Sequence, residues 1–192
     1  MKTFIIFIIY ILYNSYISDK MENVADNYYD TREKNNKTTP KVYDISHKYL
    51  PNLHKYNNIH HIITIIFVLP ILFDFNILQE FLGYFIVIFI IRSITILVTI
   101  LPKYKECKYN GKTLFHGLFG GCYDKIFSGH FASVFLATLL YLKYNWINLP
   151  MLILINFINS IGILLSRSHY TIDLIVALFI TLFIYQNNLR VK

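Results

Sequence analysis

Residues 82–101 read LGYFIVIFIIRSITILVTIL, an apolar run in which Arg92 is the one charged residue. A run of about 20 apolar residues matches the length of α-helix that crosses the hydrocarbon core of a bilayer. Its β-branched and aromatic residues would also suit strands in water. Lipid, however, requires each backbone polar group to be paired within the segment, which favours a helix. This stretch therefore predicts a membrane-spanning helix.

Other apolar segments lie on both sides of this run. They cover residues 3–17, 59–78, 129–146, 148–165 and 171–187. We therefore predict an all-α, polytopic membrane protein, built as a bundle of six transmembrane helices with both termini on one side. Residues 3–17 are short for a span and follow Lys2, so a signal-like segment stays open as the alternative. Pro70 predicts a kink in the second segment.

This pattern divides the chain into four parts. Residues 1–17 form the first helix or signal-like segment, and residues 58–188 form the membrane domain. Between them, residues 18–57 are rich in polar side chains and lack apolar periodicity, which predicts a loop. Residues 189–192 form a short tail.

The composition agrees with a membrane protein. Of the 192 residues, 55% are hydrophobic and only 15% are charged, against roughly 25% charged residues in soluble domains. The net charge of +7 indicates an anionic lipid surface or a phosphate-bearing substrate. Nucleic-acid binding is not expected, because the basic residues are scattered through loops. The two cysteines, Cys107 and Cys122, are too few for a Cys-rich metal site.

Four ionisable residues lie in or near the predicted spans, namely Arg92, His130, His169 and Asp173. Each costs roughly 2.5–3.5 kcal/mol at membrane depth and so needs a reason. His169 and Asp173 are four apart, which on a helix brings them within hydrogen-bonding reach. A carboxylate bonded to an imidazole orients it and supports its positive charge. The alternative is a pair that caps the sixth span. Asp74 lies near the end of its segment, where we expect the membrane interface.

His130 follows Ser128 and Gly129 at the start of the fourth span. Ser128 predicts a helix N-cap, and the exposed N–H groups of a helix start favour an anion such as phosphate. The alternative is a plain capped helix start.

Arg92 is too deep to reach the surface freely, so we expect it to face the bundle interior. A guanidinium suits phosphate, and the alternative is an ion pair with Asp173 or Asp124. The predicted topology brings Arg92, His130, His169 and Asp173 to one membrane face. Two histidines and a carboxylate can transfer a phosphoryl group without a metal: one His attacks phosphorus, the Asp supports it, and the other His protonates the leaving oxygen.

Residues 122–130 read CYDKIFSGH, residues 169–173 read HYTID and residues 92–102 read RSITILVTILP. In order and spacing they resemble the C-G-D-x-x-[FY]-S-G-H, H-Y-T-x-D and R-x-x-T…T-x-L-P motifs of the sphingomyelin synthase family. These are ceramide phosphotransferases related to type 2 phosphatidic acid phosphatases. Tyr123 departs from the motif glycine, and Phe131 replaces the usual threonine.

The resemblance implies a transferase that moves a phosphocholine-type head group from a glycerophospholipid to the primary hydroxyl of ceramide, releasing diacylglycerol. It implies no cofactor and no metal. His169 would be the nucleophile, Asp173 would assist it, and His130 would act as acid and then base. We assign substrate and phosphate binding to Arg92, Ser128, Gly129, Asp124 and Tyr170.

Two alternatives remain open. A lipid phosphatase or phospholipase C-like hydrolase would use the same triad with water as acceptor. The Phe127-Ser128-Gly129-His130 form, rather than one beginning with proline, favours the transferase. A catalytically silent lipid-binding membrane protein is the non-enzyme alternative, and the intact triad argues against it.

The resemblance implies a multi-pass protein of the Golgi, endoplasmic reticulum or plasma membrane, with a lumenal or exoplasmic active site. Most of the 18 Lys and Arg residues fall in the loops of that side, so the positive-inside rule predicts the reverse orientation. In the implied topology Cys107 and Cys122 share one lumenal loop. A disulfide and two unpaired thiols both stay open.

Overall fold

The computed structural model describes residues 2–34, 42–56, 58–103, 107, 122–123 and 125–191. All regular structure in these ranges is helical, which confirms the all-α class. The α-helices are α1 (Lys2–Lys34), α2 (Ile45–Tyr49), α3 (Asn58–Val68), α4 (Phe75–Val98), α6 (Gly129–Lys143), α7 (Leu149–Leu165) and α8 (Thr171–Gln186). Two 3₁₀ helices, η1 (His54–Tyr56) and η2 (Leu69–Phe73), precede and follow α3.

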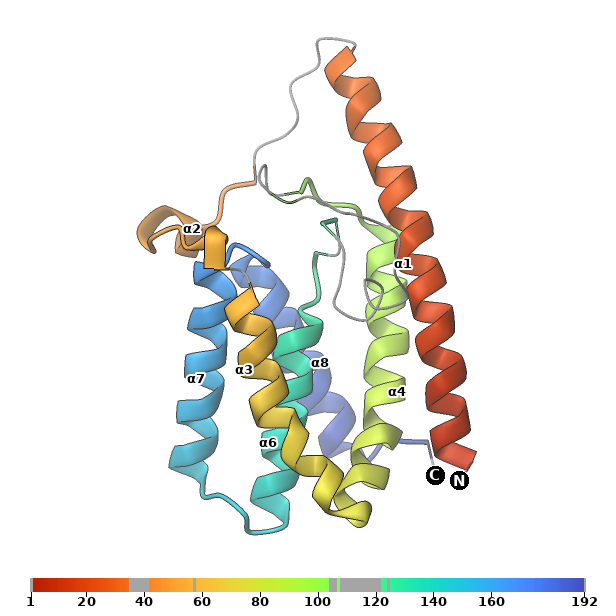
Figure 1. Ribbon diagram of the computed structural model, residues 1–192, viewed down its shortest axis with the longest axis vertical. Helices are drawn as coiled ribbons and strands as arrows, with labels where there is room; N and C mark the ends of the chain where they lie inside the picture. The colour runs from red at the N-terminus through yellow and green to blue at the C-terminus, as the bar shows by residue number, and fades with distance from the viewer. Residues whose placement is uncertain are drawn as a thin grey trace.

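The long helices lie side by side and alternate in direction (Figure 1). α1, α4 and α7 run one way, whereas α3, α6 and α8 run back, so both termini lie at the same end. The last residues of α1, α4 and α7 lie at the opposite end, as the predicted topology requires. α6 is the central helix, because it packs against α3, α4, α7 and α8 and most of its side chains are buried.

Two helices are long and apolar enough to cross a membrane: Thr3–Tyr29 within α1, and α4. The other apolar helices cover 58–73, 129–143, 149–165 and 171–186. At about 1.5 Å per residue they extend about 22–26 Å, less than the roughly 30 Å of an average hydrocarbon core. The structure thus provides a helix for each of the predicted segments.

α1 differs from the prediction, because it continues as one helix through residues 18–34, where we expected a loop. Glu22, Ala25 and Tyr29 are buried in this extension and recur at helical spacing on one face. Tyr123 covers that face: its ring stacks on Tyr29 with 5.5 Å between centroids, and its N–H donates to Glu22 Oε1 at 2.9 Å. Tyr123, which replaces the motif glycine, therefore packs residues 122–123 against α1.

The predicted kink at Pro70 takes the form of a change of helix type. α3 ends at Val68, and the chain continues as the 3₁₀ helix η2, because proline cannot donate the backbone bond that an α-helix interior needs. Asp74 then caps α4, accepting hydrogen bonds from the N–H groups of Asn76 and Ile77 at 2.9 and 3.1 Å. α4 consequently begins at Phe75 rather than at the predicted residue 82.

A polar cluster fastens α4 to α6 and to the C-terminus at the end remote from the α4–α6 connection. Glu80 is buried and accepts from Lys143 Nζ at 2.5 Å, from Arg190 Nη1 at 2.6 Å and from the Tyr144 hydroxyl at 2.9 Å. A buried carboxylate is tolerated only when it is paired in this way.

We predict that Glu80→Ala lowers the thermal unfolding midpoint of the protein in detergent micelles. Losing one partner of a buried ion pair costs about 3–5 kcal/mol. Lys143 remains 43% exposed, so we expect about 1–3 kcal/mol here. Gln79→Ala, at the exposed neighbouring position, is the matched control and should leave the midpoint unchanged. Equal midpoints for both variants would contradict the structural role of Glu80.

Candidate active site

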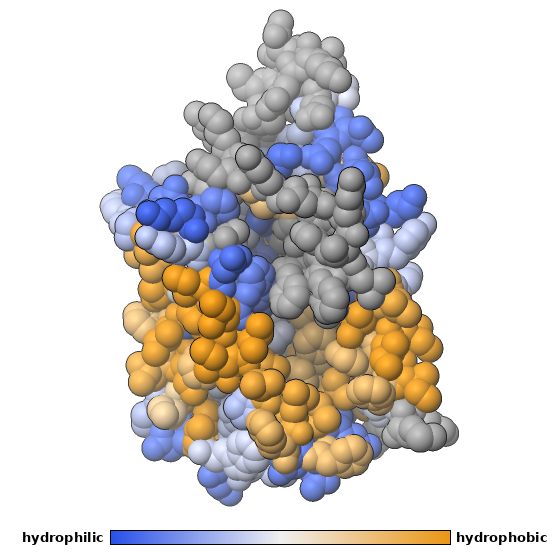
Figure 2. Space-filling model, viewed as in Figure 1, coloured by the Kyte–Doolittle hydropathy of each residue, from blue (hydrophilic) through white to orange (hydrophobic). Residues whose placement is uncertain are grey.

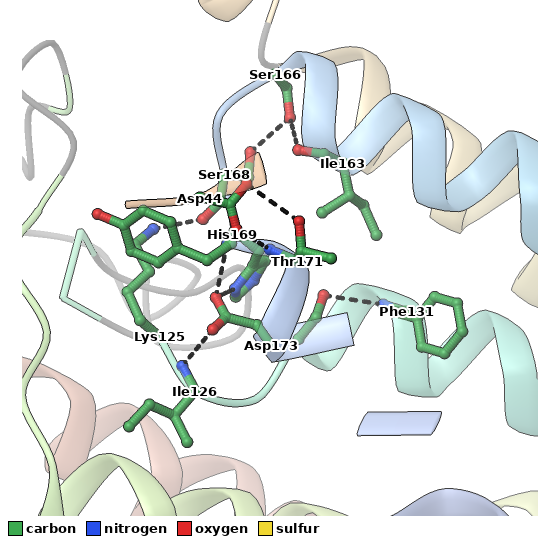
Figure 3. Close-up of polar contacts among 12 residues, drawn as sticks. Asp44, Lys125, Ile126, Phe131, Ile163, Ser166, Ser168, His169, Thr171 and Asp173 are labelled. Atoms are coloured by element: carbon green, nitrogen blue, oxygen red, sulfur yellow. Dashed lines mark hydrogen bonds and ion pairs between the residues drawn. The ribbon is translucent and has the colours of Figure 1, made fainter. Parts of the chain in front are cut away.

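The start of α8 holds a buried His–Asp pair (Figure 3). His169 Nδ1 lies 2.9 Å from Asp173 Oδ2, and Asp173 is completely buried. His169 precedes α8 instead of sharing a helical face with Asp173. The reason is that Asp173 Oδ2 also accepts from the Tyr170 N–H at 3.0 Å, which starts the helix at Thr171. The pair is thus both a helix cap and a His–Asp dyad, the two interpretations that the sequence left open.

The loop before α6 closes over the same carboxylate. The Ile126 N–H donates to Asp173 Oδ1 at 2.9 Å, and the Ser128 N–H donates to the Asp173 carbonyl at 3.2 Å. Ile126 adopts φ of 73°, a left-handed conformation that is strained for a β-branched residue. Such strain persists where surrounding contacts over-determine the backbone, often at functional sites.

Lys125 is a buried cation that the sequence analysis did not assign to the site. Its side chain is 4% exposed, and its ammonium donates to the Ser168 carbonyl, beside His169 (Figure 3). Burial lowers the pKa of Lys125, while Asp173 acts against this shift. Its position inside the motif before α6 could have pointed to Lys125. In the sequence, however, it resembles the other lysines of the loops.

Burial also lowers the pKa of His169 below its ordinary value of 6.5, although Asp173 opposes the shift. Lys125 and Arg92 add to the lowering through their positive charges. The lowered pKa favours the neutral imidazole of His169 at pH 7. Because Nδ1 donates to Asp173, the lone pair resides on Nε2, which makes this atom a candidate nucleophile.

His130 lies in the first turn of α6, beside Arg92. The predicted N-cap is confirmed: Ser128 Oγ accepts from the Phe131 N–H at 3.3 Å. Arg92 is 3% exposed and faces the bundle interior, as predicted. A Cβ at Gly129 would lie 3.1 Å from Arg92 Nε, so glycine permits the close approach of the guanidinium to the start of α6.

A pocket opens beside these residues, between α1, α3, α4 and α6. Its polar lining includes Asn14, His61, Thr64, Arg92, His130 and Ser133, and its apolar lining includes Phe85 and Phe89. His130 also interacts electrostatically with His169 and Arg92. The structure therefore places Arg92 and His130 at one cavity, with His169 within electrostatic reach of His130, a setting suited to a phosphate on an apolar molecule.

Two further histidines, which the sequence analysis passed over, contact this group. His61 Nδ1 lies 2.7 Å from His130 Nε2, and the His60 ring lies 4.7 Å from the His130 ring. Both residues begin α3, at the polar edge of an apolar segment, where a pair of histidines reads as an ordinary helix start.

Asp44 braces the site from the segment that was predicted to be a loop. Its Oδ2 accepts from the Thr171 N–H at 2.7 Å, and its Oδ1 accepts from the Thr171 hydroxyl at 3.1 Å (Figure 3). Oδ1 also accepts from the His47 N–H at 3.0 Å. A ring nitrogen of His47 also lies 3.1 Å from the His169 carbonyl. The start of α8 is thus held from both sides.

The remaining predictions concern the neighbouring loop. Tyr170 donates its hydroxyl to the Pro102 carbonyl at 3.3 Å, so it ties α8 to the end of α4. Asp124 lies outside the described residues. Cys107 and Cys122 form a disulfide with an S–S distance of 2.10 Å, which decides between the two alternatives that the sequence left open.

The part of the chain that holds these residues is similar to known proteins. Residues 121–189 match the family described as PAP2 superfamily C-terminal. A stretch of 64 residues is 38% identical to phosphatidylinositol:ceramide inositolphosphotransferase from Trypanosoma cruzi (strain CL Brener). That stretch covers 31% of this chain and 19% of the relative, so the similarity concerns a minor part of both. The predicted resemblance to PAP2-related ceramide phosphotransferases is confirmed.

We predict that Lys125→Met raises the pKa of His169, because removing a nearby cation favours the protonated imidazole. In wild type, His169 should be protonated only below pH 6.5, and in the variant the midpoint should move upward. Histidine-labelled NMR titration in detergent measures both values. Lys143→Met, at the opposite end of the bundle, is the control. An unchanged His169 midpoint in Lys125→Met would contradict the electrostatic contact.

Proposed function

We propose that this chain is a multi-pass membrane phosphotransferase that moves a phosphate-linked head group from a glycerophospholipid to the primary hydroxyl of ceramide. One observation carries the proposal: His169, oriented by buried Asp173, lies within electrostatic reach of His130, and His130 and Arg92 line a partly apolar pocket. The match to the PAP2 family and the printed activity of the trypanosome relative support the same chemistry.

The first half-reaction breaks the donor phosphodiester. Nε2 of His169 attacks phosphorus, and the bond from phosphorus to the diacylglycerol oxygen breaks. His130 enters as the imidazolium, gives one proton to that oxygen as diacylglycerol leaves, and becomes the neutral imidazole. Asp173 stabilises the positive charge that develops on the His169 ring. The head group is then held on His169 as a phosphohistidine.

The second half-reaction passes the head group to the acceptor. The ceramide hydroxyl gives its proton to His130 and attacks phosphorus, and the phosphorus–nitrogen bond breaks to restore neutral His169. Arg92 and Lys125 stabilise the negative charge on the phosphate oxygens in both transition states. Each half-reaction thus returns the proton that the other one uses.

The surface supports insertion of the bundle in a bilayer. Figure 2 shows an apolar band across the middle of the visible face, with hydrophilic residues toward both ends. On α7 and α8 the exposed apolar side chains include Ile153, Leu154, Phe157, Phe179 and Phe183. Exposed apolar area of this extent is costly in water. We infer six crossings, with the bilayer thinning around the shorter helices.

The disulfide supports a lumenal or exoplasmic site. Cys122, one of the two disulfide cysteines, lies four residues before Ile126, whose N–H binds the Asp173 carboxylate. The disulfide and the active site therefore share one end of the bundle. Disulfides persist in oxidising compartments. We give this observation more weight than the Lys and Arg count, because Lys125, one of the counted cations, is buried in the site.

The donor head group has two candidates. The motif resemblance favours phosphocholine, whereas the printed activity of the trypanosome relative favours phosphoinositol. Both head groups are joined through the phosphodiester that His169 would attack, so the proposed mechanism accepts either, and the assay below distinguishes them.

We predict that membranes containing the wild-type chain convert a fluorescent short-chain ceramide to a head-group product. Phosphatidylcholine, phosphatidylinositol and phosphatidylethanolamine are offered separately, and products are identified by mass. His169→Ala should abolish the product. Asp173→Asn should lower the rate by orders of magnitude, because the amide no longer supports the charged ring.

Expression and membrane insertion of the variants are measured in parallel. The matched control is Gln79→Ala, far from the site. Diacylglycerol or head-group release without a ceramide product would identify a hydrolase instead. Undiminished transfer by His169→Ala would refute the nucleophile.

We also predict that the segment between α1 and α2 is glycosylated when the chain is expressed in a eukaryotic cell. It contains Asn36-Lys37-Thr38, an acceptor pattern for N-glycosylation. If the end of the bundle that holds the active site faces the lumen, this segment is on the side where N-glycosylation takes place. Glycosidase should increase gel mobility for wild type and not for Asn36→Gln. A cysteine-labelling result that places this segment in the cytosol would contradict the orientation.

A further inference from the structure

Three histidines meet where α3 packs against α6. His60 and His61 belong to the first turn of α3, and His130 belongs to the first turn of α6. The ring centroids are 3.9 Å apart for His60 and His61, and 4.7 Å from His130 to each of the others. One ring nitrogen from each residue lies within 4.8 Å of the other two.

This donor set suits zinc. Imidazole nitrogens are good ligands for Zn²⁺, and three of them leave a fourth position open. A tetrahedral ion with bonds of about 2.0–2.1 Å holds its nitrogen ligands about 3.3 Å apart. The 2.7 Å contact between His61 and His130 would widen slightly, and the longer separations would shorten. Side-chain rotations achieve such changes without moving the helices.

The surroundings provide access and orientation. His61 and His130 line the pocket beside Arg92, which offers an entry path and room for a fourth ligand. Ser168 Oγ lies 3.2 Å from His60 Nδ1 and 3.3 Å from its Nε2, so Ser168 contacts the His60 ring at its edge and can bond to whichever nitrogen does not bind the metal. The nearby positive charge of Arg92 opposes a dication, so we expect reversible binding, weaker than at a structural zinc site.

We propose that His60, His61 and His130 form a Zn²⁺ site, and that zinc bound there inhibits the enzyme. The site itself stands on the three imidazoles. The inhibition rests on the proposed function, because zinc would occupy the ring nitrogen through which His130 carries its proton. Zinc would thereby stop the departure of diacylglycerol and the activation of the ceramide hydroxyl together.

The first experiment measures zinc binding without reference to activity. The full chain in detergent micelles competes with a chromogenic chelator for added ZnCl₂. Wild type and the control His54→Gln, a histidine outside the cluster, should each bind one zinc ion. The double variant His60→Gln/His61→Gln should bind at least tenfold more weakly. No binding by wild type, or equal binding by all three proteins, would overturn the proposal.

A second measurement avoids variants altogether. X-ray absorption at the zinc edge, on wild type loaded with one equivalent of zinc, should show three imidazole ligands at about 2.0 Å. A coordination shell with fewer than two imidazoles would overturn the assignment, even if the double variant failed to fold.

The transferase assay then separates the two proposals. Zinc should inhibit wild type and His54→Gln, and EDTA should restore the rate. The residual activity of the double variant should need at least tenfold more zinc for half inhibition. If zinc binds through the histidines and no transferase activity exists, the proposed function fails and the metal site stands. An active enzyme that is insensitive to bound zinc would refute the inhibition.

Discussion

The buried carboxylate of Asp173 is the constraint on which the site depends. It has no exposure to solvent, so its oxygens must be satisfied within the protein. His169, Tyr170 and Ile126 supply the donors. These bonds start α8, orient the imidazole and hold the strained loop before α6. One carboxylate therefore joins two sequence motifs that lie far apart in the chain.

The central position of α6 explains why the other groups gather at the same place. Because α6 packs against α3, α4, α7 and α8, its first turn receives Arg92 from α4 and the paired histidines from α3. Gly129 allows this crowding, since a side chain there would press on Arg92. The result is a cavity edge that Arg92, His61 and His130 line together, an electrostatic arrangement that favours phosphate.

Part of the fold was predictable because lipid imposes simple rules. Apolar runs with few charges indicate helices, and each predicted run became a helix. The extension of α1 was not predictable from this pattern. Its buried face contains Glu22 and Tyr29 instead of an apolar stripe, and it became stable through Tyr123, a partner about a hundred positions away. The cap by Asp74 likewise moved the start of α4, since local propensity places helix ends poorly.

The sequence by itself determined the helical class and the order of the segments, and it marked His130, His169, Asp173 and Arg92 as candidates for the site, because these inferences rest on local pattern and residue chemistry. The tertiary structure alone decided that Lys125 is buried beside His169, that Asp44 braces Thr171, that the two cysteines pair and that His60 and His61 reach His130. Each of these contacts joins separate elements. Their distances follow from how whole helices and loops pack, and no local spacing in the chain encodes them.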